Sequence, residues 1–292
     1  MPKSDFAKLR ASPRLSLIVA THGRTHELRR LLTSVVEGDY DEIEVIVVDQ
    51  NPHGFLDPVL DEFAGALQLI HLHSPRGASR ARNVGLRSAR GEVVGFPDDD
   101  SFFPPGTLRA LNLAFELDPN RDGVIGAFVD PHGAPGLPWP DPPGWVSPAV
   151  VWRRTVTFAC FLRRETLAAV EGFAEQMGPG ADSTCQSGED GDLMLRVLKL
   201  GARVWHDPEI KVAHPRLFPD FSRATRNKRY RYAKSDGQVL RRHPMPLWWM
   251  SAFFAAPLLR AAAAAGLGAP REVAFHVLTA AGRARGYFLG QR

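Results

Sequence analysis

Short hydrophobic runs alternate with helical repeats along the first hundred residues. Four apolar runs are each long enough for a buried strand: residues 15–20, 43–48, 67–72 and 92–96. Between them, apolar residues recur at three- and four-residue spacing in 26–36 and 78–89, which predicts helices, and 58–67 suits a third helix. This alternation is typical of βαβ units. It predicts an α/β fold with a mostly parallel central sheet flanked by helices.

The pattern changes in the second half of the chain. Residues 130–148 hold seven prolines, a density that predicts a long loop. A strand is then expected at 156–162 and a helix at 190–200. Short strands are expected at 203–206 and 210–213, directly before His214.

Beyond Pro244 the chain becomes strongly apolar. Residues 247–259 carry no charge, but Pro257 and Arg260 interrupt the run, and a membrane span needs about 20 apolar residues. A buried helix or a helix lying in a membrane interface therefore fits better than a span. We favour the interface because a basic cluster precedes this stretch: Arg223, Arg226, Lys228, Arg229, Arg231, Lys234, Arg241 and Arg242.

Composition excludes several classes of protein. With 292 residues, 44% of them hydrophobic, the chain can bury a sizeable core, which excludes a disordered or collagen-like protein. The two cysteines, Cys160 and Cys185, have no metal-ligand spacing, so we expect no structural zinc site and a reducing cytoplasm. Residues 1–14 contain no apolar segment, so no secretory signal is expected.

Charge is distributed unevenly along the chain. From Arg216 onward there are 14 lysines and arginines against three acidic residues, whereas the preceding 215 residues hold 22 against 29. A basic segment on an acidic body suits an anionic partner, such as a membrane surface or a nucleic acid. The simpler interpretation is that these basic residues form a solvent-exposed surface that binds no partner.

Three consecutive carboxylates, Asp98, Asp99 and Asp100, follow a predicted strand. They repel one another unless a cation offsets their charge. Side chains at positions i and i+2 of an extended segment face the same way, so Asp98 and Asp100 can converge. Mg²⁺ and Mn²⁺ prefer such oxygen ligands together with substrate phosphates. We favour a metal site over a solvated acidic turn, because apolar residues flank the segment.

Three further features carry candidate chemistry. Glu189, Asp190 and Asp192 precede a predicted helix, where acids either stabilise its N-terminus or supply a general base. His214 by itself is more often a structural histidine than a ligand. The arginines of 76–83 lie at a loop-to-helix transition, which suits phosphate binding or an ordinary helix surface.

Taken in order, five segments resemble a known family: LSLIVATHGR (15–24), EVIVVD (44–49), GASRARNVG (77–85), VVGFPDDD (93–100) and GEDGDLMLR (188–196). Over roughly Leu15 to Pro215 the chain resembles a family 2 glycosyltransferase of GT-A fold, of the bacterial type linked to surface polysaccharides. We therefore expect a GT-A domain over 1–215, with a donor half at about 15–101 and an acceptor half at about 102–215. A basic and apolar helical C-terminal extension is expected over 216–292.

The resemblance implies roles for individual residues. Thr21 and Asp49 would line the nucleotide pocket, with Asp49 accepting a hydrogen bond from the base or ribose, and Arg82 would face the diphosphate. Asp98 or Asp99 would lie nearer the ribose or sugar. Asp100 and His214 would hold a divalent cation, Mn²⁺ or Mg²⁺. Asp190 would be the general base, with Glu189 and Asp192 as rivals.

Two segments depart from the family pattern. His22-Gly23 stands where the family usually has Tyr-Asn, and Gln50-Asn51-Pro52 replaces the common Asp-Gly-Ser. Both departures lie where the donor nucleotide would bind. They leave the identity of its base open.

The reaction implied by the resemblance is an inverting, metal-dependent transfer. A nucleotide-diphosphate sugar would donate to a hydroxyl of a glycan or a polyprenyl-diphosphate-linked acceptor, in cell-surface polysaccharide assembly. Trp139 and Trp145 would offer surfaces for sugar stacking. We expect the protein in the cytoplasm, as a peripheral protein on the inner face of the cell membrane.

Two alternatives remain at this stage. A nucleotidyltransferase shares much of the architecture, but it normally has a Gly-rich basic loop after the first strand, of which His22-Gly23-Arg24 is a poor version. A non-catalytic nucleic-acid binder would use the basic segment with Tyr230, Tyr232, Trp248 and Trp249. Such a binder has no use for Asp98 to Asp100, so we expect no nucleic-acid partner.

Overall fold

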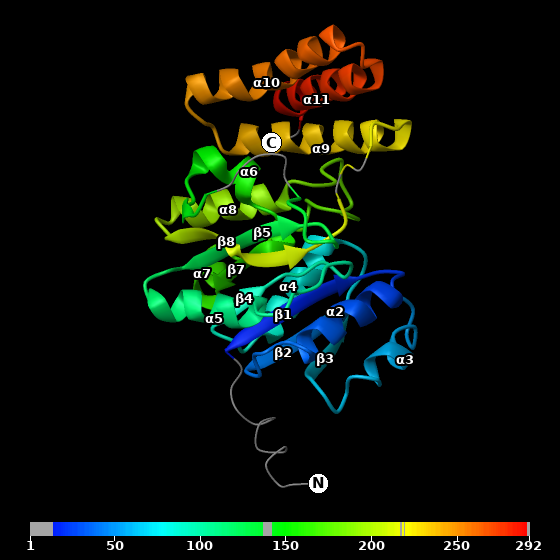
Figure 1. Cartoon of the computed structure of the whole chain (residues 1–292), viewed down its shortest axis with the longest axis vertical. Coiled ribbons are helices and arrows are strands. Elements are labelled where there is room, and N and C mark those ends of the chain that lie inside the picture. The colour runs from blue at the N-terminus through cyan, green and yellow to red at the C-terminus, as the bar shows by residue number, and fades with distance from the viewer. Residues whose placement is uncertain (1–13, 137–141, 217, 219, 291–292) are drawn as a thin grey trace.

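The computed structural model describes residues 14–136, 142–216, 218 and 220–290. Its centre is an eight-stranded sheet in the order β3-β2-β1-β4-β7-β5-β8-β6 (Figure 1). The strands are β1 (Leu15–Thr21), β2 (Ile43–Asp49), β3 (Gln68–His73), β4 (Val93–Gly95), β5 (Gly123–Val129), β6 (Gly144–Trp145), β7 (Cys160–Arg163) and β8 (Val204–Ala213).

The helices are α2 (His26–Val36), α3 (Asp57–Leu60), α4 (Ala78–Ser88), α5 (Thr107–Leu117), α6 (Val151–Arg154), α7 (Arg164–Ala169), α8 (Glu189–Lys199), α9 (Arg223–Arg242), α10 (Leu247–Gly266) and α11 (Pro270–Leu289). Short 3-10 turns cover Pro148–Val150 and Thr157–Ala159. The predicted α/β fold, with a mostly parallel sheet and a helical C-terminal part, is confirmed.

Strand direction places several strand ends at the same edge of the sheet. β1 pairs in parallel with β2 and β4, and β2 with β3. β7 runs antiparallel between β4 and β5, so β5 and its parallel neighbour β8 share the direction of β4. The carboxyl ends of β1 to β5 and β8 therefore meet at one edge, which is where α/β sheets bind ligands.

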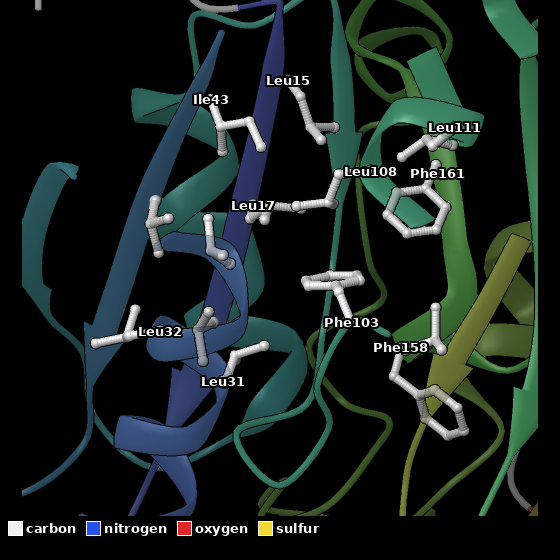
Figure 2. Packing of buried hydrophobic residues seen from close by; sticks show 14 of the residues in the cluster. Leu15, Leu17, Leu31, Leu32, Ile43, Phe103, Leu108, Leu111, Phe158 and Phe161 are labelled. Carbon is white, nitrogen blue, oxygen red and sulfur yellow. The ribbon is translucent and has the colours of Figure 1, made fainter. Parts of the chain in front are cut away.

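Two apolar clusters cover the two faces of the sheet. One joins strand residues such as Leu17 and Val45 to α2 and α5, through Leu31, Leu32 and Leu108 (Figure 2). The other packs the opposite face against α4, α7 and α8. Because side chains of a strand alternate between the faces, nearly continuous apolar strands are needed to fill both clusters, as the sequence of β1 and β2 shows.

Most predicted elements are present, but their extents differ in places. The helix expected over 58–67 ends at Leu60, and the chain continues in turns with bonds such as Phe63 N–H to the Leu60 carbonyl. The strands expected at 203–206 and 210–213 are one strand, β8, whose register with β5 shifts after Asp207. The shift coincides with Pro208, which has no N–H to give to the ladder. Helix α5 and strand β5 were not predicted.

The strand expected over 156–162 is shorter than the apolar pattern suggested. Thr157–Ala159 forms a 3-10 turn, and only Cys160–Arg163 pairs as β7. In 130–148 the described residues are mostly irregular, as expected, apart from the two-residue strand β6.

The C-terminal helices form a layer at one end of the molecule, with α9 between α10–α11 and the rest of the chain (Figure 1). The backbones of α9 and α11 approach closely: a Cβ atom added to Gly286 of α11 would collide with the Lys234 carbonyl of α9. Glycine at this position therefore allows the two helices to touch.

Pro257 interrupts the apolar sequence but not the helix, since α10 runs unbroken from Leu247 to Gly266. Pro257 lies on its buried stripe with Phe253, Ala261 and Ala264, at helical spacing, where packing offsets the missing hydrogen bond. By length and composition α10 could cross a membrane: it has 20 residues and a mean hydropathy of 1.3. Only four of its residues are buried: Phe253, Pro257, Ala261 and Ala264.

Candidate functional site

The three consecutive aspartates lie directly after β4, at the edge where the strand ends meet. Each is paired with a cationic side chain. Arg82 Nη2 contacts Asp98 Oδ1 at 2.9 Å, and Arg24 Nη1 contacts Asp99 Oδ1 at 2.7 Å and Asp100 Oδ2 at 2.6 Å. His214, which follows β8, brings Nε2 to 3.1 Å from Asp100 Oδ1. These pairs offset the repulsion that the sequence predicted.

Asp98, Asp100 and His214 converge as the sequence anticipated. One ligand atom from each lies within 4.8 Å of the others. His214 Nδ1 faces the Pro215 carbonyl at 2.5 Å, and its ring stacks on Phe158 at 4.3 Å, so Nε2 is aimed at the carboxylates. Two carboxylate oxygens and one imidazole nitrogen form a donor set that suits Mn²⁺ or Mg²⁺.

The local charges shift the pKa values of these groups. Burial lowers the pKa of His214, but the hydrogen bond to Asp100 and the charges of Asp98 and Asp100 outweigh it and raise the value. Burial raises the pKa of Asp100, yet His214 and Arg24 bring it below its usual range. Asp99 differs, because burial there outweighs Arg24 and keeps its pKa raised. Asp100 is therefore the better anionic ligand of the two.

The acidic cluster at the start of α8 separates into three different environments. Glu189 Oε1 contacts Arg82 Nη1 at 3.1 Å, and Asp192 contacts both Arg196 Nε at 2.9 Å and His243 Nε2 at 3.0 Å. The Asp190 carboxylate instead accepts the backbone N–H of Gly191 at 2.7 Å. Glu189 and Asp192 thus neutralise basic neighbours, which leaves Asp190 as the cluster's candidate base.

Asp190 has the protonation behaviour that a general base needs. Burial raises its pKa to about 7, and the charge of Glu189 adds to the rise, while the Gly191 N–H and the charge of Arg82 act against it. A pKa near neutrality lets the carboxylate both take up and release a proton at the working pH.

Arg82 connects the two acidic motifs. Its guanidinium is buried, with its side chain 6% exposed, and it bonds Asp98 on one side and Glu189 on the other. The family resemblance predicts that Arg82 faces the diphosphate. The structure places it between the carboxylate cluster and the candidate base.

Asp49 lies fully buried at the end of β2, close to the end of β1, where Thr21 is also buried. Its Oδ1 accepts from the backbone and side-chain N–H groups of Asn51, both at 2.7 Å. Asn51 Oδ1 in turn accepts from the Gly23 N–H at 2.6 Å. Gly23 and Asn51 belong to the two segments that depart from the family pattern. Their contact holds the loops after β1 and β2 together.

Sequence reasoning missed three residues at the site. The sequence pattern around Arg24 indicates only a poor version of a Gly-rich basic loop, although its guanidinium bridges Asp99 and Asp100. Lys228 and Tyr232 come from α9. Burial lowers the pKa of Lys228 against the attraction of Asp100, and burial raises the pKa of Tyr232 to about 12, helped by Glu189. Two residues of α9, in the segment expected to meet a membrane or another anionic partner, thus interact electrostatically with the carboxylates of the site.

Trp145 lies away from the site. It pairs with Trp205 in β8, near the strand's start, whereas His214 follows the strand's end. Its ring packs on Trp205 at 5.0 Å and beneath Arg203 at 4.6 Å. The geometry therefore does not favour Trp145 as a sugar-stacking surface of this site. Trp139 lies outside the described residues.

Comparisons with known proteins agree with this architecture. The model of glycosyl transferase family 2 matches residues 16–166. The pre-mycofactocin glycosyltransferase of Mycobacterium tuberculosis is 28% identical over 217 residues, which is 68% of this chain and 42% of that protein. The O-antigen biosynthesis protein RfbC of Myxococcus xanthus is 30% identical over 220 residues, 70% of this chain and 16% of that protein. The chain therefore spans less than half the length of these two relatives.

Solved structures share the fold over nearly the whole chain. The mannosyltransferase PcManGT from Pyrobaculum calidifontis, in complex with GDP-Man and Mn²⁺, superposes with a TM-score of 0.65 at 20% identity, covering 97% of this chain and 89% of that one. S. aureus TarS 1-349, in complex with UDP-GlcNAc, gives 0.58 at 17% identity, covering 95% and 92%. At these identities the likeness shows the fold.

Proposed function

The chain belongs to glycosyl transferase family 2, and from that premise we propose that it moves a sugar from a nucleotide-diphosphate donor to an acceptor hydroxyl, with inversion. The observation that carries the proposal is the convergence of Asp98, Asp100 and His214 at one edge of the sheet, with Arg82 linking them to the α8 motif that holds Asp190. The alternatives of a nucleotidyltransferase and a nucleic-acid binder gain no support from the family match.

The donor half, about 15–101, holds the nucleotide. Asp49, oriented by Asn51, accepts a hydrogen bond from the base or ribose, and Thr21 borders the same strand ends. Asp98 or Asp99 lies nearer the ribose or sugar. Arg82 faces the diphosphate with a guanidinium that cannot lose its charge at working pH.

Asp100 and His214, with Asp98, would hold Mn²⁺ or Mg²⁺. Such an ion, when bound, supplies Lewis-acid stabilisation of the negative charge that develops on the departing diphosphate. PcManGT, whose structure contains GDP-Man and Mn²⁺, supports this assignment.

Asp190 takes the proton of the acceptor hydroxyl. As the acceptor hydroxyl oxygen forms a bond to the anomeric carbon, the bond from that carbon to the diphosphate oxygen breaks on the opposite face. A single displacement of this kind inverts the anomeric centre. The acceptor half, about 102–215, supplies α8 and positions the base.

The acceptor is a glycan or a lipid diphosphate carrying one, in assembly of a cell-surface polysaccharide. RfbC of Myxococcus xanthus is named for O-antigen biosynthesis, and ExoU of Rhizobium meliloti, 26% identical over 64% of this chain, for succinoglycan biosynthesis. We place the protein in the cytoplasm, peripheral on the inner face of the membrane.

The donor assignment is tested by measuring thermal shifts of the full chain with UDP, GDP, dTDP and CMP, each with and without Mn²⁺. A ligand that binds only the folded state raises the melting temperature by mass action. We expect one diphosphate to stabilise the chain in a Mn²⁺-dependent way and its sugar derivative to support transfer. No stabilisation by any of them, together with no transfer, would overturn the proposal.

The position of Arg24 predicts that this side chain weakens the binding of a divalent cation to the aspartates after β4. Its guanidinium contacts Asp99 Oδ1 and Asp100 Oδ2, so its positive charge competes with a divalent cation for the same carboxylates. We expect Arg24→Ala to tighten Mn²⁺ binding about fivefold, the equivalent of about 1 kcal/mol for a partly exposed ion pair. Isothermal titration of Mn²⁺ alone measures this. Arg29→Ala, which removes an exposed arginine paired with Glu62, is the matched control; equal or weaker Mn²⁺ binding by Arg24→Ala would contradict the argument.

The C-terminal extension, 216–292, carries the membrane contact. Leu247, Trp248 and Leu259 on α10 are at least 70% exposed, next to the basic helix α9. Apolar side chains beside cations suit an anionic bilayer surface. We expect Trp248→Ser and Leu259→Ser each to lower partitioning into anionic vesicles roughly tenfold, from about 1.5 kcal/mol of lost apolar burial.

Cosedimentation with vesicles measures this partitioning. Leu117→Ser is the matched control, because Leu117 is 80% exposed on α5, outside the C-terminal layer. If the α10 variants partition as the unmodified chain does, peripheral attachment through α10 is wrong.

A further inference from the structure

A second cluster of metal-ligating side chains lies at the same edge of the sheet, at the ends of β2 and β3. Asp49, His71 and His73 each offer one ligand atom within 4.8 Å of the other two. The parallel register of β2 and β3 pairs Asp49 with His73 and Val47 with His71. Residues two apart on a strand share a face, so all three side chains stand on one side of the sheet.

The geometry of this cluster resembles part of a coordination sphere. His71 Nε2 lies 3.2 Å from Asp49 Oδ2. Two ligands held tetrahedrally at about 2.0 Å from one zinc ion are separated by about 3.3 Å. The His71 and His73 rings are 4.7 Å apart between centroids, so binding of one ion requires the more exposed His73 side chain to move closer to the other two.

The surroundings direct the Asp49 carboxylate at His71. Asp49 Oδ1 is occupied by the two N–H groups of Asn51, which leaves Oδ2 directed at His71. On the other side, the His53 ring packs on His73 at 4.2 Å. Partners that orient the ligands in this way are a regular feature of metal sites.

The donor set differs in chemistry from the carboxylate site after β4. Two imidazoles and one carboxylate favour a borderline ion such as Zn²⁺ over Mg²⁺, and three protein ligands leave a fourth position for water. The earlier expectation of no structural zinc site rested on the cysteines. The present cluster uses none, and its partly exposed histidines suit an ion that exchanges with solvent.

We propose that Asp49, His71 and His73 form a Zn²⁺ site at the nucleoside end of the donor pocket, so that bound Zn²⁺ and the donor nucleoside exclude each other. The exclusion rests on the proposed function, in which Asp49 accepts a hydrogen bond from the base or ribose. Zinc would then inhibit transfer by taking Asp49 away from the donor.

Cobalt substitution tests the metal site directly, because Co²⁺ absorbs visible light strongly in a tetrahedral site with nitrogen ligands. The untagged 292-residue chain carrying Asp100→Ala, in which the carboxylate site is impaired, is titrated with Co²⁺ at neutral pH, and Zn²⁺ is then added. We expect an absorption band that Zn²⁺ removes. His71→Ala and His73→Ala, each made in this background, should weaken Co²⁺ binding at least about tenfold.

His132→Ala, which removes an exposed histidine outside the cluster, is the matched control and should keep the band. A band that survives both His71→Ala and His73→Ala, or no band at all, would overturn the site. Circular dichroism of each variant shows whether the fold is kept.

A second measurement separates this proposal from the proposed function. Zn²⁺ is added to the otherwise unmodified chain with the nucleoside diphosphate that stabilises it, and the thermal shift is recorded. Loss of nucleotide stabilisation, restored in His73→Ala, supports exclusion; unchanged stabilisation beside an intact cobalt band overturns exclusion but keeps the site. A cobalt band in a chain that neither binds a nucleotide nor supports transfer would keep the metal site and overturn the proposed function instead.

Discussion

Replacing Asp190 with asparagine is expected to lower the transfer rate about 10²–10⁴-fold, the usual contribution of a positioned general base. Asparagine keeps the hydrogen bond from the Gly191 N–H but cannot take up the proton of the acceptor. The measurement is the rate of sugar transfer at saturating donor and acceptor. Donor-induced thermal shifts should remain, because Asp190 does not bind the nucleotide.

The same variant should be more stable than the unmodified chain above neutral pH. Burial raises the pKa of Asp190 to about 7, compared with about 3.9 in the unfolded chain. The folded state therefore holds the proton more tightly, and stability is lost as pH rises between these two values. Asparagine never ionises, so Asp190→Asn should melt at a higher temperature above about pH 7.

The pH dependence of kcat/KM gives a further test of Asp190 as the general base. Because the base works only when ionised, kcat/KM of the unmodified chain should rise with pH and level off above about 7. Asp182→Asn, the same change at an exposed acid before α8, is the matched control and should leave rate and profile unchanged. Near-normal transfer by Asp190→Asn would remove Asp190 from the role of base.

Asp100→Ala is expected to abolish the Mn²⁺-dependent part of donor binding and to lower transfer roughly a thousandfold. The variant removes an oxygen ligand from the set formed with Asp98 and His214. Stabilisation of the leaving diphosphate by a metal contributes several kcal/mol, and each 1.36 kcal/mol is about tenfold in rate. Thermal shifts with the donor nucleotide, with and without Mn²⁺, and transfer rates measure both effects.

Two further variants serve as controls for this result. Asp100 also pairs with Arg24 and His214, so Asp100→Asn, which keeps the side-chain shape, separates loss of the ligand from loss of packing. Asp61→Ala removes an exposed acid after α3 and should leave cation-dependent binding unchanged. Full Mn²⁺-dependent stabilisation of Asp100→Ala and Asp100→Asn would show that the ion binds elsewhere.

The sequence by itself determined the elements whose patterns are strong and local. β1, α2 and β2 match their predicted ranges to within one residue, since buried strands and an amphipathic helix each impose a clear period on the chain. The aspartates after β4 and the acids of α8 were also evident, because each motif lies within a few consecutive residues. β5 was missed because it lies next to a proline-rich stretch that dominated the pattern.

Only the tertiary structure decided which of these groups act together. Arg24 reaches aspartates 75 residues and more along the chain, and α9 brings Lys228 and Tyr232 to the site. Similarly, Asp190 stands out from Glu189 and Asp192 only because their partners are Arg82, Arg196 and His243. Ion pairs and burial depend on distance in space, and strand order and helix packing bring together residues for which the local sequence carries no shared period.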